Sequence, residues 1–333
     1  MKALALLSGG LDSILSICIL REQGIKIEAV CFISSFFDGK KAKKAARNLK
    51  IPLITIDITD QLLSLIKSPP HGFGKGANPC IDCHILMVKT AGVLMDKVGA
   101  SFLISGEVLG ERPKSQSRKA LRIIDTESGW GDYLLRPLTA KNLTPTIPEK
   151  RGWVKRERLL GIKGRSRKAQ LELARKFGIK DFPMPAGGCL LTDPNFSRRV
   201  KYILSTGRLN KNEIELLKIG RHFHLNHQAR VIIGRCKEEN IKIEQLSTPG
   251  DIILRVKKYK GPITLFRGNF ALELFHRAAS FTARYSDAPE DKEVEVEYWQ
   301  VPEGEIKKIK VKAAGVEDIE KSRIEDAHEA FCL

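Results

Sequence analysis

Short apolar segments alternate with helix-forming segments through the first 105 residues of the chain. Apolar runs typical of buried strands stand at 3–7, 27–33, 53–57 and 101–105. Helical patterns lie between them, at 11–23, 40–49, 59–66 and 85–98. Strands that alternate with helices pair in parallel, and the helices cover both faces of the sheet. This order predicts an α/β fold with a doubly wound parallel sheet.

The character of the sequence changes twice further along, which predicts three regions. Residues 1–140 carry the alternating pattern, residues 141–207 are densely basic, and residues 208–333 read as a second, smaller α+β domain. In the last region strands are expected at 222–225, 230–234, 252–256, 263–266, 294–299 and 306–311, and helices at 237–246 and 270–285.

The formal net charge of +18 favours a polyanionic partner, because each phosphate contact releases condensed counterions. A lysine-rich surface that binds nothing is the plainer alternative. Between 141 and 176 the basic residues have few acidic neighbours, whereas a solvated helix face normally mixes signs. This stretch is the predicted track for an RNA backbone. Its expected phosphate contacts are Lys150, Arg151, Lys155, Arg156, Arg158, Arg165, Arg167 and Lys168.

No apolar run reaches the roughly 20 residues that a membrane span needs. The apolar start, 3–7, looks like a signal peptide but is broken at once by Ser8-Gly9-Gly10. We therefore expect a cytoplasmic protein without a membrane partner.

The loop Ser8-Gly9-Gly10-Leu11-Asp12-Ser13 joins the first strand to the first helix. Two glycines allow the backbone to approach an anion closely, and the helix start offers free N–H groups to phosphate. Asp12 is unusual beside phosphates unless a metal ion is present. A plain turn before a capped helix is the alternative, and the order of strand, loop and helix favours phosphate binding.

Three of the seven cysteines lie among Gly and Pro, where packing does not explain them: Cys80, Cys83 and Cys189. Cys18, Cys31 and Cys236 are expected in the core. Three convergent thiolates suit a soft metal or an iron–sulfur cluster. We favour a 4Fe-4S cluster with one open iron. Catalytic cysteines that form a persulfide, a closed zinc site that includes His84, and covalent haem on C-x-x-C-H are the alternatives.

The first loop resembles the PP-loop, SGGxDS, of the ATP pyrophosphatase superfamily. That resemblance implies that residues 8–13 bind ATP, with Asp12 near Mg²⁺, and that ATP is cleaved to AMP and pyrophosphate. A PP-loop followed by N-P-C-x-x-C and a distant cysteine is similar to the tRNA thiolases, the 2-thiouridylases and 4-thiouridine synthetases. It implies sulfur chemistry at Cys80, Cys83 and Cys189. Ser105 and Gly106 resemble the family's loop beside the nucleotide, where Phe32 is also expected.

The C-terminal region resembles the RNA-binding domain of ribosome-quality-control factors, on 230–235, Gly250-Asp251 and 260–262. Together these resemblances imply an ATP-dependent tRNA sulfurtransferase. It would adenylate a uridine carbonyl and replace its oxygen with sulfur, with Asp12 and the three cysteines as catalytic residues. Its expected partners are tRNA and a sulfur donor, either sulfide or a persulfide carrier, and a homodimer is also considered. A PP-loop amide-forming synthetase and a non-catalytic RNA-binding protein are the alternatives.

Overall fold

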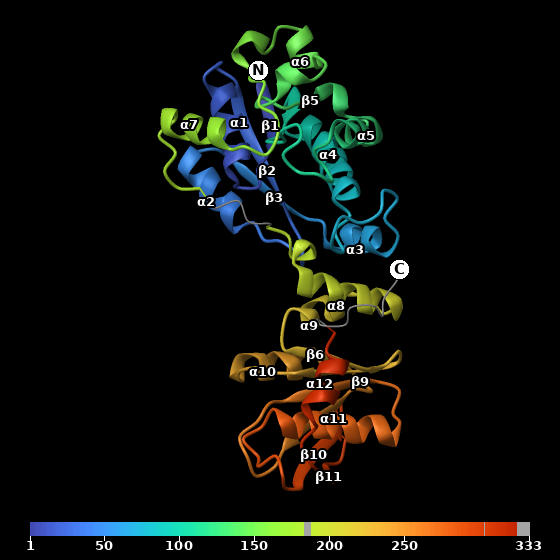
Figure 1. Cartoon of the computed structure of the whole chain (residues 1–333). Coiled ribbons are helices and arrows are strands. Elements are labelled where there is room, and N and C mark those ends of the chain that lie inside the picture. The colour runs from blue at the N-terminus through green and yellow to red at the C-terminus, as the bar shows by residue number, and fades with distance from the viewer. Residues whose placement is uncertain (183–187, 303, 325–333) are drawn as a thin grey trace. The chain divides into compact units, whose positions relative to one another are not determined.

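The computed structural model describes residues 1–182, 188–302 and 304–324, which divide into two compact units. The first unit is Met1–Thr192 and the second begins at Asp193 (Figure 1). The predicted basic region, 141–207, is therefore split between the two units, because its first part packs on the N-terminal sheet. Residues 325–333 of the predicted last region lie outside the described residues.

The first unit contains a five-stranded parallel sheet in the order β3-β2-β1-β4-β5, which confirms the predicted α/β fold. Its strands are β1 (Lys2–Leu6), β2 (Lys26–Ile33), β3 (Leu53–Asp57), β4 (Phe102–Ile104) and β5 (Leu134–Leu135). Its α-helices are α1 (Leu11–Arg21), α2 (Lys40–Leu49), α3 (Thr59–Lys67), α4 (Cys80–Lys97), α5 (Arg118–Ser128), α6 (Ile147–Lys150) and α7 (Lys168–Lys176). Short 3₁₀ turns are η1 (Gly131–Tyr133), η2 (Ala140–Asn142), η3 (Arg156–Arg158) and η4 (Leu190–Thr192).

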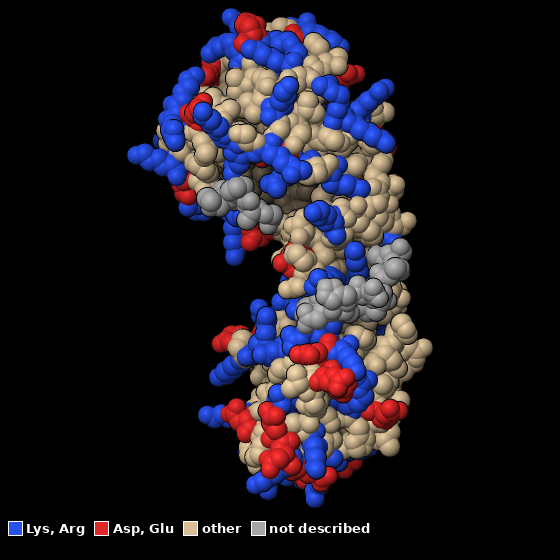
Figure 2. Space-filling view, in the orientation of Figure 1, with Lys and Arg blue, Asp and Glu red and all other residues tan. Residues whose placement is uncertain are grey.

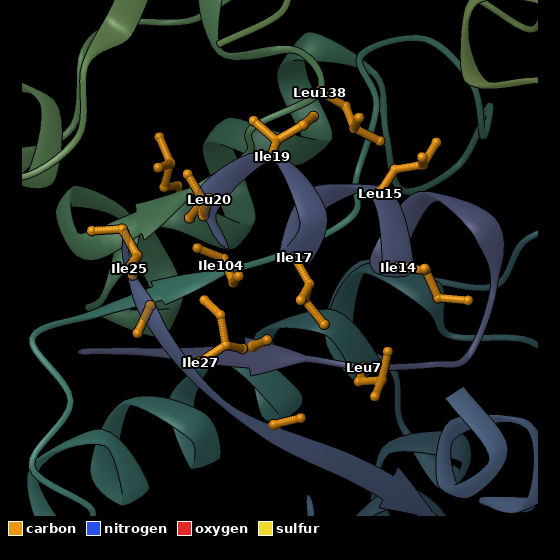
Figure 3. Packing of buried hydrophobic residues seen from close by; sticks show 14 of the residues in the cluster. Leu7, Ile14, Leu15, Ile17, Ile19, Leu20, Ile25, Ile27, Ile104 and Leu138 are labelled. Atoms are coloured by element: carbon orange, nitrogen blue, oxygen red, sulfur yellow. The ribbon is translucent and has the colours of Figure 1, made fainter. Parts of the chain in front are cut away.

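Alternate residues of the central strand feed two hydrophobic cores, because successive side chains of a strand point to opposite faces. Ala3 and Ala5 pack with α1, α2 and α7, and Figure 3 shows part of this cluster. Leu4 packs on the other face with apolar residues of α4 and α5. Figure 1 shows these helices on opposite sides of the sheet.

Helix α4 begins at Cys80, so the predicted start at Ile85 is wrong. The apolar periodicity becomes visible only after the cysteine pair, and the preceding Pro and Gly residues conceal the first turn. Pro79 is in fact the N-cap, and Asp82 lies in the first turn, where a negative charge is favourable. The C-x-x-C pair is therefore helical, and residues three apart lie on one side of a helix.

The second unit is an antiparallel six-stranded sheet in the order β11-β10-β8-β9-β7-β6, packed with helices, which confirms the predicted α+β class. Its strands are β6 (Arg221–Asn226), β7 (Ala229–Ile233), β8 (Ile252–Val256), β9 (Thr264–Gly268), β10 (Val294–Gln300) and β11 (Lys307–Val311). Its helices are α8 (Pro194–Ser205), α9 (Lys211–Leu217), α10 (Lys237–Leu246), α11 (Leu272–Arg284) and α12 (Val316–Ser322).

The second sheet also has a core on each face. Residues of α11, such as Phe275 and Phe281, pack on one face, and Leu216 of α9 and Ile243 of α10 pack on the other. Cys236 is exposed at the N-cap of α10, so its predicted place in a core is wrong. No helix in the described part of the chain is both long and apolar enough to cross a membrane. The cytoplasmic location stays a prediction.

Candidate active site

The loop between β1 and α1 is shaped by close backbone contacts. Gly9 has a φ of +77°, and a Cβ there would lie 2.3 Å from the carbonyl carbon of Lys41 in α2. Gly10 is the N-cap of α1. Because glycine has no side chain, the N-cap residue offers no side-chain acceptor to the first N–H groups of the helix. The Ser13 hydroxyl donates to the Gly10 carbonyl at 2.8 Å, and the Gly10 N–H donates to Ser8 Oγ at 3.3 Å. The loop is thus held tightly while the first N–H groups of α1 stay uncapped by a side chain.

Asp12 lies in the first turn of α1 with a buried carboxylate. Its Oδ1 has no hydrogen-bond partner among the described residues. Burial raises the pKa of Asp12, and the charge of Arg167 partly offsets this effect. An unpaired buried oxygen is unfavourable unless a ligand satisfies it.

Helix α7 brings further polar groups to Asp12. Gln170 is fully buried, its Nε2 donates to Glu111 Oε2 at 3.4 Å, and its amide group lowers the pKa of Asp12. Burial and the nearby charge of Asp12 raise the pKa of Glu111. Arg112 also acts on the charge of Asp12. Two carboxylates, one amide and two guanidinium groups therefore surround the start of α1.

The loop after β4 lies directly against the loop after β1. A Cβ on Gly106 would fall 2.4 Å from the Ser13 nitrogen, so only glycine fits there. Ser105 and Phe32 are buried: the Ser105 hydroxyl donates to Glu107 Oε2 at 3.0 Å, and Phe32 packs in the core with α4. Leu11 is also a core side chain. Leu11 and Phe32 therefore have side chains committed to packing, and contact with a nucleotide through their backbones stays a prediction.

Glu107 is the centre of a buried ionic network. Arg136 Nε donates to its Oε2 at 2.8 Å, and His84 Nδ1 lies 2.8 Å from its Oε1. Arg136 is held in turn by Asp125, through Nη2 at 2.8 Å. Burial by itself raises the pKa of Glu107, but the charge of Arg136 and the bonds from His84 and Arg136 outweigh it and hold this pKa well below its usual range. Glu107 is therefore ionised, and it ties α4 and β5 to the end of β4.

The three predicted cysteines are free thiols, and ionisation of one affects the pKa of another. Burial raises the pKa of Cys83, and negative charge on Cys189 and Cys80 raises it further. Burial, with a smaller effect of Cys80, raises the pKa of Cys189 to about 12. Interactions of this kind require sulfur atoms that are near one another. The segment of Cys189 is also fastened to the loop after β2, because the Leu190 N–H donates to the Phe36 carbonyl at 2.9 Å.

A short path of contacts joins the thiols to the loop after β1. His84 follows Cys83 on α4 and contacts Glu107. Glu107 directly follows Gly106, and the backbone of Gly106 lies in close contact with the backbone of Ser13. The path lies wholly within the first unit, so it does not depend on the placement of the second.

The eight basic residues predicted to contact RNA lie in different environments. Arg156 forms an ion pair with Glu149 and donates to the carbonyls of Ala140 and Leu143, so it holds the local fold together. Arg167 lies near Asp12, whose pKa its charge lowers. The other six side chains are at least partly exposed: Lys150, Arg151, Lys155, Arg158, Arg165 and Lys168. Figure 2 shows lysine and arginine side chains spread over the visible face of the N-terminal part.

Sequence reasoning did not single out Arg136 and Gln170, and it considered His84 only in a zinc site or a haem motif. Arg136 directly follows the buried pair Leu134–Leu135, and a charge at the carboxyl end of a parallel strand is a usable signal. Gln170 lies within a basic helix, where no local pattern distinguishes it.

Comparisons with known proteins give separate matches for the N-terminal and the C-terminal part of the chain. Residues 1–144 match the family described as "Thiamine biosynthesis protein (ThiI)", and residues 220–323 match the "NFACT protein RNA binding domain". A "Probable tRNA sulfurtransferase" of Thermoanaerobacter sp. (strain X514) is 30% identical over 155 residues, which are 44% of this chain and 39% of the relative. The "tRNA-specific 2-thiouridylase MnmA" of Syntrophomonas wolfei is 28% identical over 185 residues, 52% of each chain.

The chain thus spans between about two fifths and half of the length of these curated relatives. A solved structure described as a 4-thiouridine synthetase–RNA complex with bound ATP is 23% identical and covers 54% of this chain and 42% of its own, with a TM-score of 0.36. A score this low supports no argument about the site. Each of the two family matches, however, lies within one structural unit. The N-terminal part of the chain thus matches the ThiI family, and the C-terminal part matches the NFACT RNA-binding domain.

Proposed function

We propose that this protein uses ATP to replace a carbonyl oxygen of a tRNA uridine with sulfur. The observation that carries the proposal is the contact path from Cys83 through His84, Glu107 and Gly106 to Ser13. It links the loop at residues 8–13 to Cys83, one of the three predicted cysteines in the same compact unit. The curated relatives named tRNA sulfurtransferases support the same reaction.

The first half of the proposed reaction takes place at the loop after β1. The N–H groups at the start of α1 and the Ser8 and Ser13 hydroxyls bind the phosphates of ATP. Asp12 would hold Mg²⁺, which would neutralise part of the phosphate charge. The uridine carbonyl oxygen attacks the α-phosphorus, pyrophosphate leaves, and the oxygen becomes part of an AMP leaving group. In the second half, a sulfur nucleophile attacks the activated carbon and AMP departs, so one C–O bond is exchanged for one carbon–sulfur bond.

Cys80, Cys83 and Cys189 are the residues that would hold the sulfur chemistry, and their donor set fits an iron–sulfur cluster. Thiols ionise when they coordinate a metal, and the three cysteines would hold a 4Fe-4S cluster, which would supply sulfide as the nucleophile. Asn78 Nδ2 donates to Cys80 Sγ at 3.0 Å, a type of bond that tunes such clusters.

Within the described residues, no group of three or more His, Cys, Asp or Glu side chains is arranged around a single metal ion. Three cysteines that held a cluster would not need to surround a single metal ion. Persulfide chemistry on the same cysteines is the alternative that this donor set leaves open.

RNA is held by the exposed basic side chains between Lys150 and Lys168 and by the NFACT domain. The target base must leave its stack to reach the site, at a cost on the order of a few kcal/mol. We further propose that sulfide or a persulfide carrier donates the sulfur and that the protein acts in the cytoplasm. A homodimer is compatible with this function.

The test uses full-length protein purified without oxygen. Iron and acid-labile sulfide are assayed, and thiolated nucleosides in tRNA are measured by mass spectrometry alongside pyrophosphate release. Cys189→Ser should abolish thiolation and retain part of the pyrophosphate release. Cys236→Ser, a change at an exposed cysteine in the other unit, is the matched control and should keep both activities.

Normal thiolation by the Cys189→Ser protein would rule out both the cluster and the persulfide. An iron-free protein that thiolates tRNA only with a persulfide donor would exclude the cluster alone. Pyrophosphate release that depends on a small carboxylate rather than on tRNA would support the amide-forming reaction instead.

A further inference from the structure

Three buried polar atoms that lack a hydrogen-bond partner in the described part of the chain belong to residues at the start of α1 and in or beside α7, and two of these residues act on the third, Asp12. They are Asp12 Oδ1, Gln170 Oε1 and Arg167 Nε, and none has a hydrogen-bond partner among the described residues. Such orphaned groups are rare in a folded core, because each loses the hydrogen bonds of water without replacement. Three of them among interacting residues indicate a ligand.

Two carboxylates, those of Asp12 and Glu111, interact with each other. Gln170 is a neutral side chain beside them: its Nε2 donates to Glu111 Oε2 at 3.4 Å, and its amide group lowers the pKa of Asp12. Gln170 belongs to α7, which packs on α1. Like charges held this close repel each other unless a cation lies between or beside them.

The local charge shows which kind of ligand is required. The two carboxylates and the guanidinium groups of Arg112 and Arg167 sum to zero formal charge, and all four charges interact. A polyphosphate brought to this point adds several negative charges, so more positive charge is needed. Carboxylate and amide oxygens are the donors that Mg²⁺ and Mn²⁺ prefer, with phosphate oxygens and water completing the shell.

We propose that Asp12, Glu111 and Gln170 form a divalent-cation site that holds the phosphates of the bound nucleotide, with Arg167 beside it as a phosphate contact. The inference rests on the proposed ATP use and extends it to residues of α7, which lie beyond the stretch 1–144 that matches the ThiI family. Arg167 is thereby assigned to the nucleotide rather than to the RNA track.

Mn²⁺ is the probe, because its electron paramagnetic resonance signal reports binding without turnover. Full-length protein is titrated with Mn²⁺ in the presence of α,β-methylene ATP, which cannot be cleaved between its α and β phosphates. Glu111→Gln should raise the Kd for Mn²⁺ by about tenfold or more, in the range seen when a metal's supporting groups are removed. Glu172→Gln, an exposed change on the same helix as Gln170, is the matched control and should leave this Kd unchanged.

Gln170→Glu separates a ligand from a packing role. It adds a third carboxylate beside those of Asp12 and Glu111. If Gln170 is a metal ligand, the Kd for Mn²⁺ should fall; if its amide is purely structural, this Kd should stay the same or rise. Unchanged Mn²⁺ affinity in Glu111→Gln, or unchanged or weaker binding in Gln170→Glu, overturns the inference. The proposed function fails separately, when the wild-type protein forms no thiolated nucleoside in tRNA, so the two failures are distinguishable.

Discussion

Gly106 lies so close to Ser13 that a Cβ on the glycine would stand 2.4 Å from the serine nitrogen. Gly106 belongs to the loop after β4, and Ser13 to the first turn of α1, which follows β1; the two strands are neighbours, paired in parallel from Ala3↔Phe102 to Ala5↔Ile104. Because the carboxyl ends of parallel strands share one edge of the sheet, these two segments are forced together. The contact sets the shape of the phosphate loop.

Gly106→Ala should therefore weaken nucleotide binding without unfolding the protein. The new methyl group must displace the start of α1, and overpacking of this kind costs about 1–3 kcal/mol. At about 1.4 kcal/mol per factor of ten, we expect the Kd for ATP to rise about tenfold or more. Isothermal titration of ATP measures it. Gly161→Ala is the control, because its nearest neighbour would be the Lys141 Cβ at an ordinary 3.4 Å. Equal affinity in both variants would contradict the prediction.

Glu107→Gln should lower the free energy of unfolding of the first unit at neutral pH by up to about 3–5 kcal/mol, because it leaves Arg136 buried with one carboxylate fewer. The folded state lowers the pKa of Glu107 from 4.5, so its stabilising effect is complete above about pH 4.5 and is lost as the pH falls below that value.

The difference between the wild type and Glu107→Gln should accordingly shrink on acidification, by at most about 1.4 kcal/mol per pH unit. Urea unfolding between about pH 3 and about pH 6 checks this. The fluorescence of Trp130 and Trp153 reports on the first unit in a Trp299→Phe background. A constant difference across this range would show that Glu107 is not held ionised by its neighbours.

Glu213→Gln should destabilise the second unit. Glu213 is buried between Arg230 and Arg267, whose Nη1 donates to its Oε1 at 2.9 Å. Loss of this carboxylate leaves two buried guanidinium groups with only Asp251 as a charged partner among the described residues, at a cost of about 3–5 kcal/mol. Thermal unfolding measures the change. Glu215→Gln in the same helix removes a more exposed ion pair with Lys218, which is worth at most about 1 kcal/mol. If the two variants lost similar amounts of thermal stability, burial of the Glu213 ion pairs would not explain their contribution.

The exposed members of the basic track should contribute to RNA affinity through charge alone. Lys155→Ala combined with Arg158→Ala should weaken tRNA binding and reduce the slope of log K against log salt concentration by about 1 for each phosphate that is no longer neutralised. Filter binding across a salt series measures both quantities. Lys97→Ala, an exposed change outside the track, is the control. An unchanged slope would remove these residues from the RNA interface.

Arg156 is expected to behave differently from its neighbours in this track. It pairs with Glu149 and donates to two carbonyls, so Arg156→Ala should lower stability more than it changes the salt slope. Thermal unfolding and the same salt series, applied to this variant and to the Lys155–Arg158 double variant, separate the two effects. A large change in slope with unaltered thermal stability would place Arg156 on the RNA instead.

Local patterns in the sequence are enough to predict the order of strands and helices, the parallel sheet and the loop at residues 8–13. Each depends on neighbours within a few residues: apolar runs make strands, and two glycines followed by a helix make a phosphate loop. The predicted start of α4 is wrong for the same reason, because Cys80–Cys83 carry no apolar periodicity of their own.

What the sequence determined by itself was the chemistry available to the protein, namely a glycine loop, three unexplained thiols and a basic stretch. Tertiary structure alone decided which of these groups meet. Cys189 lies near Cys83, Glu107 joins Arg136 to His84, and Gln170 and Arg167 lie beside Asp12 because the sheet and its crossing helices gather distant segments at one edge. A contact between residues more than a hundred positions apart depends on packing, and packing leaves no periodic trace in the chain.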